Sequence, residues 1–263
     1  MTRAKLFFLG FIFFAAWLNQ TTVRGNGIRE EFQQTYTLSP AGSVRLNNIN
    51  GGIEIKVWDK NEVEVDAVKH ADDKSMMDQL KIVVDATRDT VDIDTKYPEN
   101  SNTHNDEGPS VEYTITVPSG ANLDRIKTIN GEIEISGVQG KIDASTINGT
   151  VRASGINNEC QLETVNGKID AGFVSLKSEA DVTLKSVNGS IVANFPSGIG
   201  ARIKAKTVSG KISNDFGLVS SYEKDKDSFV KVGDSIDGKI GDGGANVDAE
   251  TVNGSIKILK SGE

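Results

Sequence analysis

The sequence returns to close variants of one tetrapeptide, Thr-Val-Asn-Gly, at a nearly constant interval. The glycines of these repeats are separated by 18, 18, 22, 21 and 44 residues, and 44 equals two intervals of 22. The repeats carry the pairs Asn130-Gly131, Asn148-Gly149, Asn166-Gly167, Asn188-Gly189, Ser209-Gly210 and Asn253-Gly254. A period of this length is typical of architectures in which each unit packs against its neighbours in the stack.

Apolar and polar residues alternate on both sides of each glycine. Ile133 and Ile135 follow Gly131, and Ile142 and Ala144 precede the next repeat. Alternation with a period of two residues predicts strands. Each repeat is therefore expected to hold two strands and two corners.

Asn-Gly between alternating strands usually indicates a hairpin, but here the parity argues against one. A two-residue hairpin loop would place an apolar residue beside a polar one in every repeat, for example Val165 beside Lys168. A three-residue loop would need a left-handed conformation at residues such as the β-branched Thr150. We therefore predict a corner with positive φ at the glycine, and an Ile or Val before the Asn that faces the interior.

These features predict an all-β fold, a single-chain β-solenoid of stacked two-strand coils with Asn-Gly corners. Residues 26–263 would form one domain, with irregular N-terminal strands over 26–120 and regular repeats over 121–263. The segments 98–109 and 219–231 would be excursions from the stack. Stacking would align the corner residues into a structural ladder whose amides hydrogen-bond between coils. That ladder comprises Asn130, Gly131, Asn148, Gly149, Asn166, Gly167, Asn188, Gly189, Gly210, Asn253 and Gly254.

The N-terminus predicts export. Arg3 and Lys5 precede the apolar run from Leu6 to Leu18, which is too short to span a bilayer comfortably but fits a secretory signal. We expect residues 1–25 to be a signal peptide and the mature protein to reach the periplasm, the cell surface or the medium, with no membrane span. No clean cleavage motif is present, so an uncleaved anchor stays open.

Charge and cysteine content narrow the partners further. The net charge of −8 at pH 7 argues against nucleic acid and anionic lipid as partners. Cys160 is the only cysteine, which excludes an intramolecular disulfide. It shares the inward register of Ile142 and Val182, so we expect an inert core thiol.

No catalytic, cofactor or metal set is recognisable in the sequence. The two histidines, His70 and His104, have no partner at metal-ligand spacing. Asp143 and Asp170 are expected to face outward, and if they lie close together they could act as the acidic residues of polysaccharide-cleaving β-helices do; a solvated face is the favoured explanation for them. The stretch from Gly241 to Asp248 is similar to a calcium-binding nonapeptide but occurs once, whereas such sites need stacked copies.

Several motifs resemble a known family. They are the Gly-Gly-Ile-x-Ile-x-x-Trp strand from Gly51 to Trp58, the Tyr-x-Ile-x-Val-Pro-x-Gly stretch from Tyr113 to Gly120, and the Thr-Val-Asn-Gly repeats. Together they resemble the bacterial exported β-strand-repeat "putative adhesin" family, a domain of unknown function. The resemblance implies a cell-envelope protein with a solenoid fold and supplies no catalytic or ligand residues.

Three function classes follow from this reading. The favoured one is a non-catalytic envelope protein, adhesin-like, that binds glycan or protein without turning it over. The alternatives are a self-assembling structural scaffold, which would make self-association the partner mode, and a polysaccharide-active β-helix enzyme. We expect no enzymatic activity, because the sequence shows no nucleophile, general base or metal set.

Overall fold

The computed structural model describes residues 22–23, 27–98, 108–219 and 233–261. The predicted signal run Leu6–Leu18 lies outside the described residues, as do most of the two predicted excursions. Thr22 and Val23, inside the predicted signal segment, form a short strand. Within the described ranges no helix is long and apolar enough to cross a membrane.

The described chain forms two large β-sheets, here called sheet A and sheet B, which have eleven and ten strands. In spatial order, sheet A consists of β1 (Thr22–Val23), β2 (Ile28–Thr37), β5 (Glu62–Ala71), β8 (Ser110–Pro118), β4 (Ile53–Trp58), β10 (Ile133–Ser136), β12 (Val151–Ile156), β14 (Ile169–Phe173), β16 (Ile191–Phe195), β21 (Ile256–Lys260) and β18 (Ile212–Asn214). Sheet B consists of β19 (Asp234–Ile240), β17 (Ala201–Ser209), β20 (Ala245–Asn253), β15 (Asp181–Asn188), β13 (Cys160–Asn166), β11 (Ile142–Asn148), β9 (Asn122–Lys127), β3 (Ser43–Asn47), β7 (Thr90–Lys96) and β6 (Lys81–Ala86).

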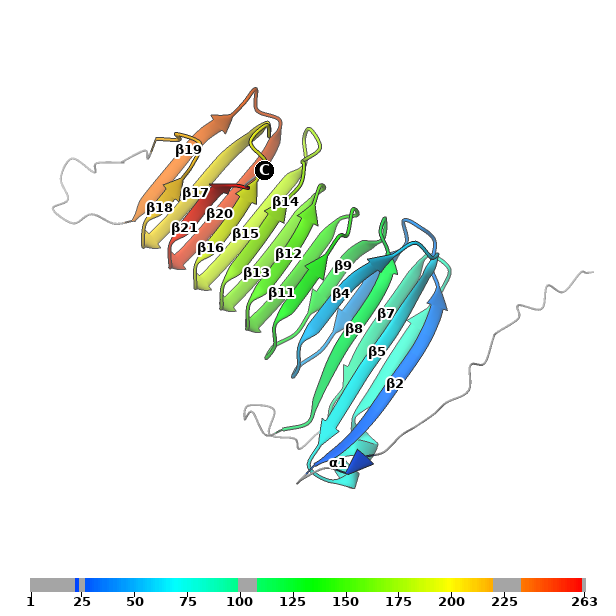
Figure 1. The fold of residues 1–263 in the computed structure, drawn as a ribbon. Coiled ribbons are helices and arrows are strands. Elements are labelled where there is room, and N and C mark those ends of the chain that lie inside the picture. Colours follow the sequence, from blue (N-terminus) through cyan, green and yellow to red (C-terminus); the bar gives the residue numbers. More distant parts are fainter. Residues whose placement is uncertain (1–21, 24–26, 99–107, 220–232, 262–263) are drawn as a thin grey trace, which may run out of the picture.

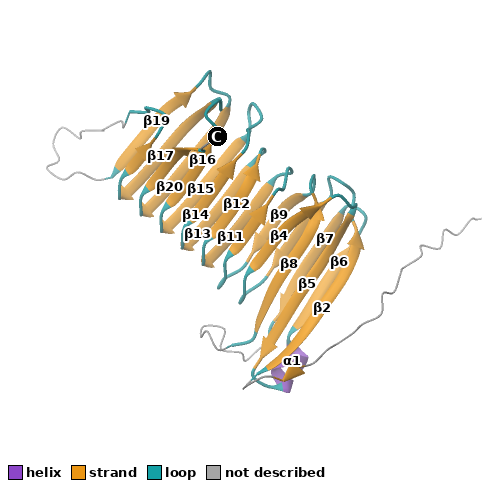
Figure 2. Ribbon diagram, in the orientation of Figure 1, coloured by secondary structure: helices purple, strands orange, loops and turns teal. Residues whose placement is uncertain are grey.

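The two sheets face each other along an elongated molecule (Figures 1 and 2). Alternate residues of each strand point inward, and their apolar side chains form one continuous core. Val44, Ile115 and Leu162 are fully buried members of it, and the Phe173 and Phe195 rings stack at 4.6 Å between centroids. Burial of one face of each sheet explains the alternation in the sequence.

The prediction of a single-chain β-solenoid is wrong. Both sheets are mixed, and the fold is closer to a β-sandwich. Parallel pairs such as β11 with β13 fill the middle, whereas β2, β5 and β8 pair antiparallel at one end and β17 pairs antiparallel with β19 at the other. The ten-residue strands β2 and β5 do not fit a unit of 18 to 22 residues with two short strands.

The spatial order of the strands also departs from their order in the chain. β20 lies between β15 and β17, and β21 lies between β16 and β18. The last repeat is therefore inserted into the stack and not added to its end. The repeat at the end of the 44-residue interval is the inserted one, and its Asn253 pairs in register with both Asn188 and Ser209. The sequence period reveals which residues are equivalent, but not which copies are neighbours.

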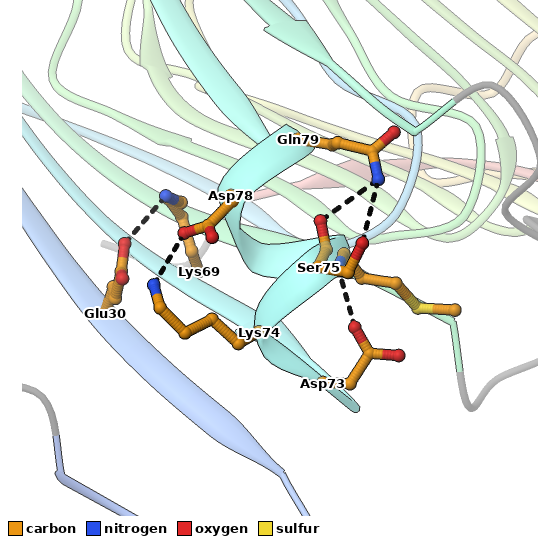
Figure 3. Close-up of polar contacts among 8 residues, drawn as sticks. Glu30, Lys69, Asp73, Lys74, Ser75, Asp78 and Gln79 are labelled. Atoms are coloured by element: carbon orange, nitrogen blue, oxygen red, sulfur yellow. Dashed lines mark hydrogen bonds and ion pairs between the residues drawn. The ribbon is translucent and has the colours of Figure 1, made fainter.

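A short helix covers the core at the end formed by β2 and β5 (Figure 3). α1 (Lys74–Gln79) begins at Asp73, whose carboxylate accepts the Met76 backbone N–H at 2.8 Å. Met77 of the helix is buried, and Leu80, directly after the helix, belongs to the hydrophobic core. Below the helix, Lys69 of β5 donates to Glu30 of β2 at 2.9 Å.

Candidate functional site

The Asn-Gly pairs connect strands of sheet B to strands of sheet A. Asn148 ends β11 in sheet B, and β12 in sheet A begins at Val151. The Asn side chains form a one-way chain of hydrogen bonds in which each Nδ2 donates to the Oδ1 of the Asn beside it. The bonds are Asn253 to Asn188 (2.8 Å), Asn188 to Asn166 (2.9 Å), Asn166 to Asn148 (2.9 Å), Asn148 to Asn130 (2.8 Å) and Asn130 to Asn50 (2.8 Å). We call this set the asparagine ladder.

The expectation of positive φ at the ladder glycines is wrong. Among the described residues, positive φ occurs at Gly51, which follows Asn50 at the end of the asparagine ladder, but not at the six glycines for which it was expected, Gly131, Gly149, Gly167, Gly189, Gly210 and Gly254. These positions require glycine because the backbones of neighbouring strand connections approach each other closely. A Cβ on Gly149 would lie 1.9 Å from the carbonyl oxygen of Gly131. Only glycine fits a position where a neighbouring carbonyl occupies the side-chain space.

The Ile or Val before each Asn was predicted to face the interior, and this too is wrong. Strands such as β11 run on to the Asn, so the alternation continues past the point where we expected the corner. Thr146 therefore points inward and Ile147 outward. The exposed fractions are 37% for Ile129, 42% for Ile147, 38% for Val165, 40% for Val187, 41% for Val252 and 45% for Val208. We call these six residues the aliphatic row.

The hydrogen bonds of the inward threonines explain how the fold tolerates a hydroxyl side chain inside and an aliphatic side chain outside. Each buried hydroxyl donates to the carbonyl oxygen of a ladder glycine on the adjacent strand connection, for example Thr146 to Gly131 at 3.0 Å and Thr164 to Gly149 at 3.0 Å. Ser186 makes the same bond to Gly167 at 3.1 Å. A buried hydroxyl with a partner carries little penalty. The Thr thus binds the corner from inside, and the aliphatic side chain is left on the surface.

A second row lies two residues before the aliphatic row on the same outer face of sheet B. In spatial order it consists of Lys127, Ser145, Glu163, Lys185, Glu250 and Lys206. We call it the charged row. The two rows are roughly 7 Å apart along the strands and each extends about 24 Å across them, given the usual spacings within a sheet.

The two rows line a shallow groove of about 770 Å³. Its lining runs from Asn47 and Asn48 beside β3 to Val208 at the end of β17, and more of it is apolar than polar. Isolated exposed aliphatic residues are common, but a contiguous row of six with a polar border is typical of an interaction surface. This groove is the candidate functional site.

The two carboxylates that the sequence offered as catalytic candidates, Asp143 and Asp170, do not assemble into a site. Asp143 lies on β11 of sheet B and Asp170 on β14 of sheet A, so the two do not lie close together. Burial raises the pKa of Asp143. Asp170 accepts hydrogen bonds from Lys168 at 2.7 Å and Asn194 at 3.4 Å. Within the described ranges no group of three His, Cys, Asp or Glu could hold a metal.

Cys160 faces the core as expected, with 2% of its surface exposed. Burial raises the pKa of its thiol, which disfavours the reactive thiolate. His70 is exposed on β5, and His104 lies outside the described residues. The Gly241–Asp248 stretch carries the chain from β19 to β20, with positive φ at Gly241, Gly243 and Gly244.

No family model and no curated protein matches this chain. Solved structures similar to it include a putative cell adhesion protein from Clostridium sporogenes (16% identity, TM-score 0.49, covering 88% of this chain and 100% of that one). A putative adhesin from Bacteroides fragilis has 11% identity and a TM-score of 0.39, with 88% and 97% coverage. A putative lipid binding protein from Parabacteroides distasonis has 11% identity and a TM-score of 0.32, with 88% and 97% coverage.

The adhesin names agree with the family that the sequence motifs resemble, the putative adhesins of unknown function. Because every one of these TM-scores is below 0.5, the likeness carries no argument about this chain, and its function is argued from the residues of the groove.

The sequence contained a signal for the groove that our reading missed. Counting in steps of two from Ile142 gives Ala144 and Thr146 inside, which leaves Ile147 outside. We instead let hydrophobicity decide the direction of Ile147. The recurrence of a hydroxyl residue immediately before each exposed aliphatic residue is the pattern that identifies this face.

Proposed function

We propose that this protein is a non-catalytic adhesin-like protein of the cell envelope that binds glycan or protein through the groove on the outer face of sheet B. The observation that carries the proposal is the aliphatic row, six exposed Ile and Val side chains, five of them on neighbouring strands of sheet B and Ile129 just beyond the end of β9. Along a strand of a sandwich, residues face alternately inward and outward, and the outward ones are normally polar. An ordered row of outward apolar side chains therefore costs free energy in water unless a partner covers it.

The shape and chemistry of the groove suit an extended partner. It crosses the strands of sheet B and offers one aliphatic wall and one polar wall of Lys, Glu and Ser. Repetition at the strand spacing of ~4.8 Å gives many weak contacts in parallel, which add up to useful affinity when the partner is itself long or repetitive. Hydroxyls of a glycan or polar side chains of a protein would find donors and acceptors along the charged row.

Export is part of the proposal. Residues 1–25 would act as a signal peptide, and residues 26–263 would be the single mature domain. The apolar run Leu6–Leu18 behind Arg3 and Lys5 supports this assignment. N-terminal sequencing of the protein recovered from outside the cytoplasm would test it: a mature N-terminus between residues 17 and 27 supports cleavage, and an intact Met1 in a membrane fraction supports the anchor.

A polysaccharide-active enzyme is the weaker alternative. Its two candidate carboxylates, Asp143 and Asp170, lie in different sheets whose outer faces point away from each other. Paired carboxylates of glycosidases must flank one bond, within roughly 5 to 10 Å. The groove therefore has no such pair from these two residues.

The test is to pass fractionated cell-wall glycans and envelope proteins over immobilised protein and to measure both retention and released products. Val187→Asp places a charge in the middle of the aliphatic row, and Val83→Asp is the matched control because Val83 is at least as exposed (48% against 40%) but lies on β6, outside the groove. We expect retention without products, lost in Val187→Asp and kept in Val83→Asp. Released products that disappear in Asp143→Asn would overturn the proposal in favour of an enzyme.

A further inference from the structure

We infer that the groove's partner is a second copy of this chain. The two copies would pack outer face to outer face through β13, β15, β20 and β17, related by a two-fold axis that runs parallel to the strands between β15 and β20. This inference rests on the proposed function, because it assigns a partner to the same groove. It makes the protein a homotypic binder.

The order of charges along the groove carries the inference. On the four strands the charged row reads Glu163, Lys185, Glu250, Lys206 in space. Reversing this order replaces every Glu with Lys and every Lys with Glu. A two-fold axis along the strands performs that reversal, so Lys185 would face the partner's Glu250 and Glu163 would face the partner's Lys206. Each pair occurs twice, as in any isologous interface.

The neighbouring row is compatible with the same axis, because the axis sets each of the row's charged residues against a neutral one. Two residues earlier on these strands stand Gln161, Thr183, Asp248 and Lys204. The same axis sets Thr183 against the partner's Asp248 and Gln161 against the partner's Lys204. Neither pair brings like charges together. Both rows are net neutral, whereas the whole chain carries −8, so this face is one where two copies can approach without repulsion.

The axis also keeps each row opposite itself, so apolar side chains meet apolar side chains. Val187 would face the partner's Val252, and Val165 would face the partner's Val208. The grooves of the two copies then lie over each other and leave a wet channel between the aliphatic contacts and the ion pairs, as in many weak interfaces.

The four charged side chains can reach a partner, although Glu163 also accepts a hydrogen bond from Gln161 of its own strand at 3.1 Å. Among the described residues the ion pairs involve other side chains, such as Arg152 with Glu132 and Lys168 with Asp170 on sheet A, and none includes Glu163, Lys185, Glu250 or Lys206. The last three are exposed and Glu163 is half-buried. Charges already paired within the chain would contribute little to a second copy.

The extent of the complementary region sets the strength of the dimer. Four strands at ~4.8 Å and about eight residues along each give a footprint of roughly 500 Å², below the ~800 Å² per partner of a standard interface. The next strands, β11 and β19, would place Asp143 opposite the partner's Asp237, which stops the contact from spreading. A weak dimer, formed at micromolar or higher concentration, fits these limits.

Sedimentation of the purified protein over about 1 to 500 μM tests the inference with two single variants. Lys185→Glu alone and Glu250→Lys alone each create two like-charge pairs across the axis, so we expect each to dimerise at least tenfold more weakly than the wild type. An equimolar mixture of the two restores both pairs between unlike chains and should recover wild-type affinity as a heterodimer. Lys257→Glu is the control with the same charge change as Lys185→Glu, at an exposed lysine of β21 in sheet A, and it should dimerise like the wild type.

Each other outcome overturns the inference. A wild type that stays monomeric throughout, single variants that dimerise normally, or a mixture that does not recover would each exclude this interface. A monomeric protein that still retains envelope glycan in a Val187-dependent way would leave the proposed function standing and refute only the second copy as partner.

Discussion

The close approach of backbones at the ladder glycines gives a sharp prediction for Gly149→Ala. The new methyl group would lie 1.9 Å from the Gly131 carbonyl oxygen and 2.6 Å from its carbon, well inside van der Waals contact. A normal carbon–oxygen contact needs more than ~3 Å, so the two connections must separate by about 1 Å or more. Neither neighbour is a flexible side chain that could move aside.

That separation would break the bonds that join the two corners. They are the Gly131 N–H to Asn148 carbonyl bond (3.0 Å), the Ile133 N–H to Thr150 carbonyl bond (2.9 Å) and the Asn148 to Asn130 side-chain bond (2.8 Å). At about 1 kcal/mol of net stability each, their loss costs roughly 3 kcal/mol. Reduced freedom of the unfolded chain offsets this by at most about 1 kcal/mol. We expect a net loss of about 2 kcal/mol or more.

Two other glycines separate steric contact from backbone conformation. A Cβ on Gly198 meets nothing within 4 Å, and Gly198 has no positive φ, so Gly198→Ala should be neutral or slightly stabilising. Gly217 also meets nothing within 4 Å but has φ of +70°, so Gly217→Ala should cost about 1 kcal/mol from strain alone.

Urea unfolding followed by circular dichroism at 25 °C measures all three variants against the wild type. The expected order of destabilisation is Gly149→Ala, then Gly217→Ala, then Gly198→Ala. If Gly149→Ala and Gly198→Ala differ by less than about 0.5 kcal/mol, close approach is not what requires glycine at the corner, and the reasoning is refuted.

Three further predictions concern the ladder and the core. Asn148→Ala removes two ladder bonds and Asn253→Ala only one, so urea unfolding should show losses of roughly 2 and 1 kcal/mol; equal losses would contradict a one-way ladder. Thr164→Val keeps the shape but removes the bond to Gly149, and should lower the free energy of unfolding by about 1 kcal/mol; no change in a denaturant titration would argue against that bond. Burial raises the pKa of the Cys160 thiol, so the free energy of unfolding should be unaffected by this thiol below its ordinary pKa of about 8.5 and should fall as pH rises above that value. A thiol reagent should label Cys160 only when the protein unfolds. Rapid labelling of the native protein at pH 8 would show that the thiol is accessible.

The presence of a corner at Asn166-Gly167 was predicted, and the structure places the flanking strands β13 and β14 in different sheets. The parity argument for it assumed that Val165 faces inward, however, and Val165 faces outward, so the prediction was right without the reason given for it. The alternation around Cys160 gave its inward direction correctly. That inference needed only the period-two geometry of a strand.

The global arrangement could not be read in the same way. The long antiparallel strands β2 and β5 pair residues such as Ile28 with Ala71, a contact that no repeat in the sequence encodes. Likewise, nothing in the repeat itself specifies that β20 pairs with both β15 and β17. Equivalent repeats have equivalent edges, so their sequences do not fix the order in which they stack.

The candidate site was missed because we gave hydrophobicity priority over strand parity. In most sandwiches an aliphatic residue beside a threonine would be the one inside. Here Thr164 is inside because its hydroxyl has a fixed acceptor on Gly149, and Val165 is outside as a consequence. The sequence does not show that a glycine carbonyl lies within reach of the Thr hydroxyl, because that contact depends on the geometry of the corner.

The central claim is that the outer face of sheet B binds a partner at the cell envelope. The most direct measurement places a photoactivatable cross-linking amino acid at position 187, in the middle of the aliphatic row, and in a separate strain at position 83 on β6, which is at least as exposed. After illumination of intact cells that produce the protein, we predict a discrete adduct from position 187, with the mass of two copies of this chain, and none from position 83. No adduct at 187, or the same adducts from both positions, would contradict the account.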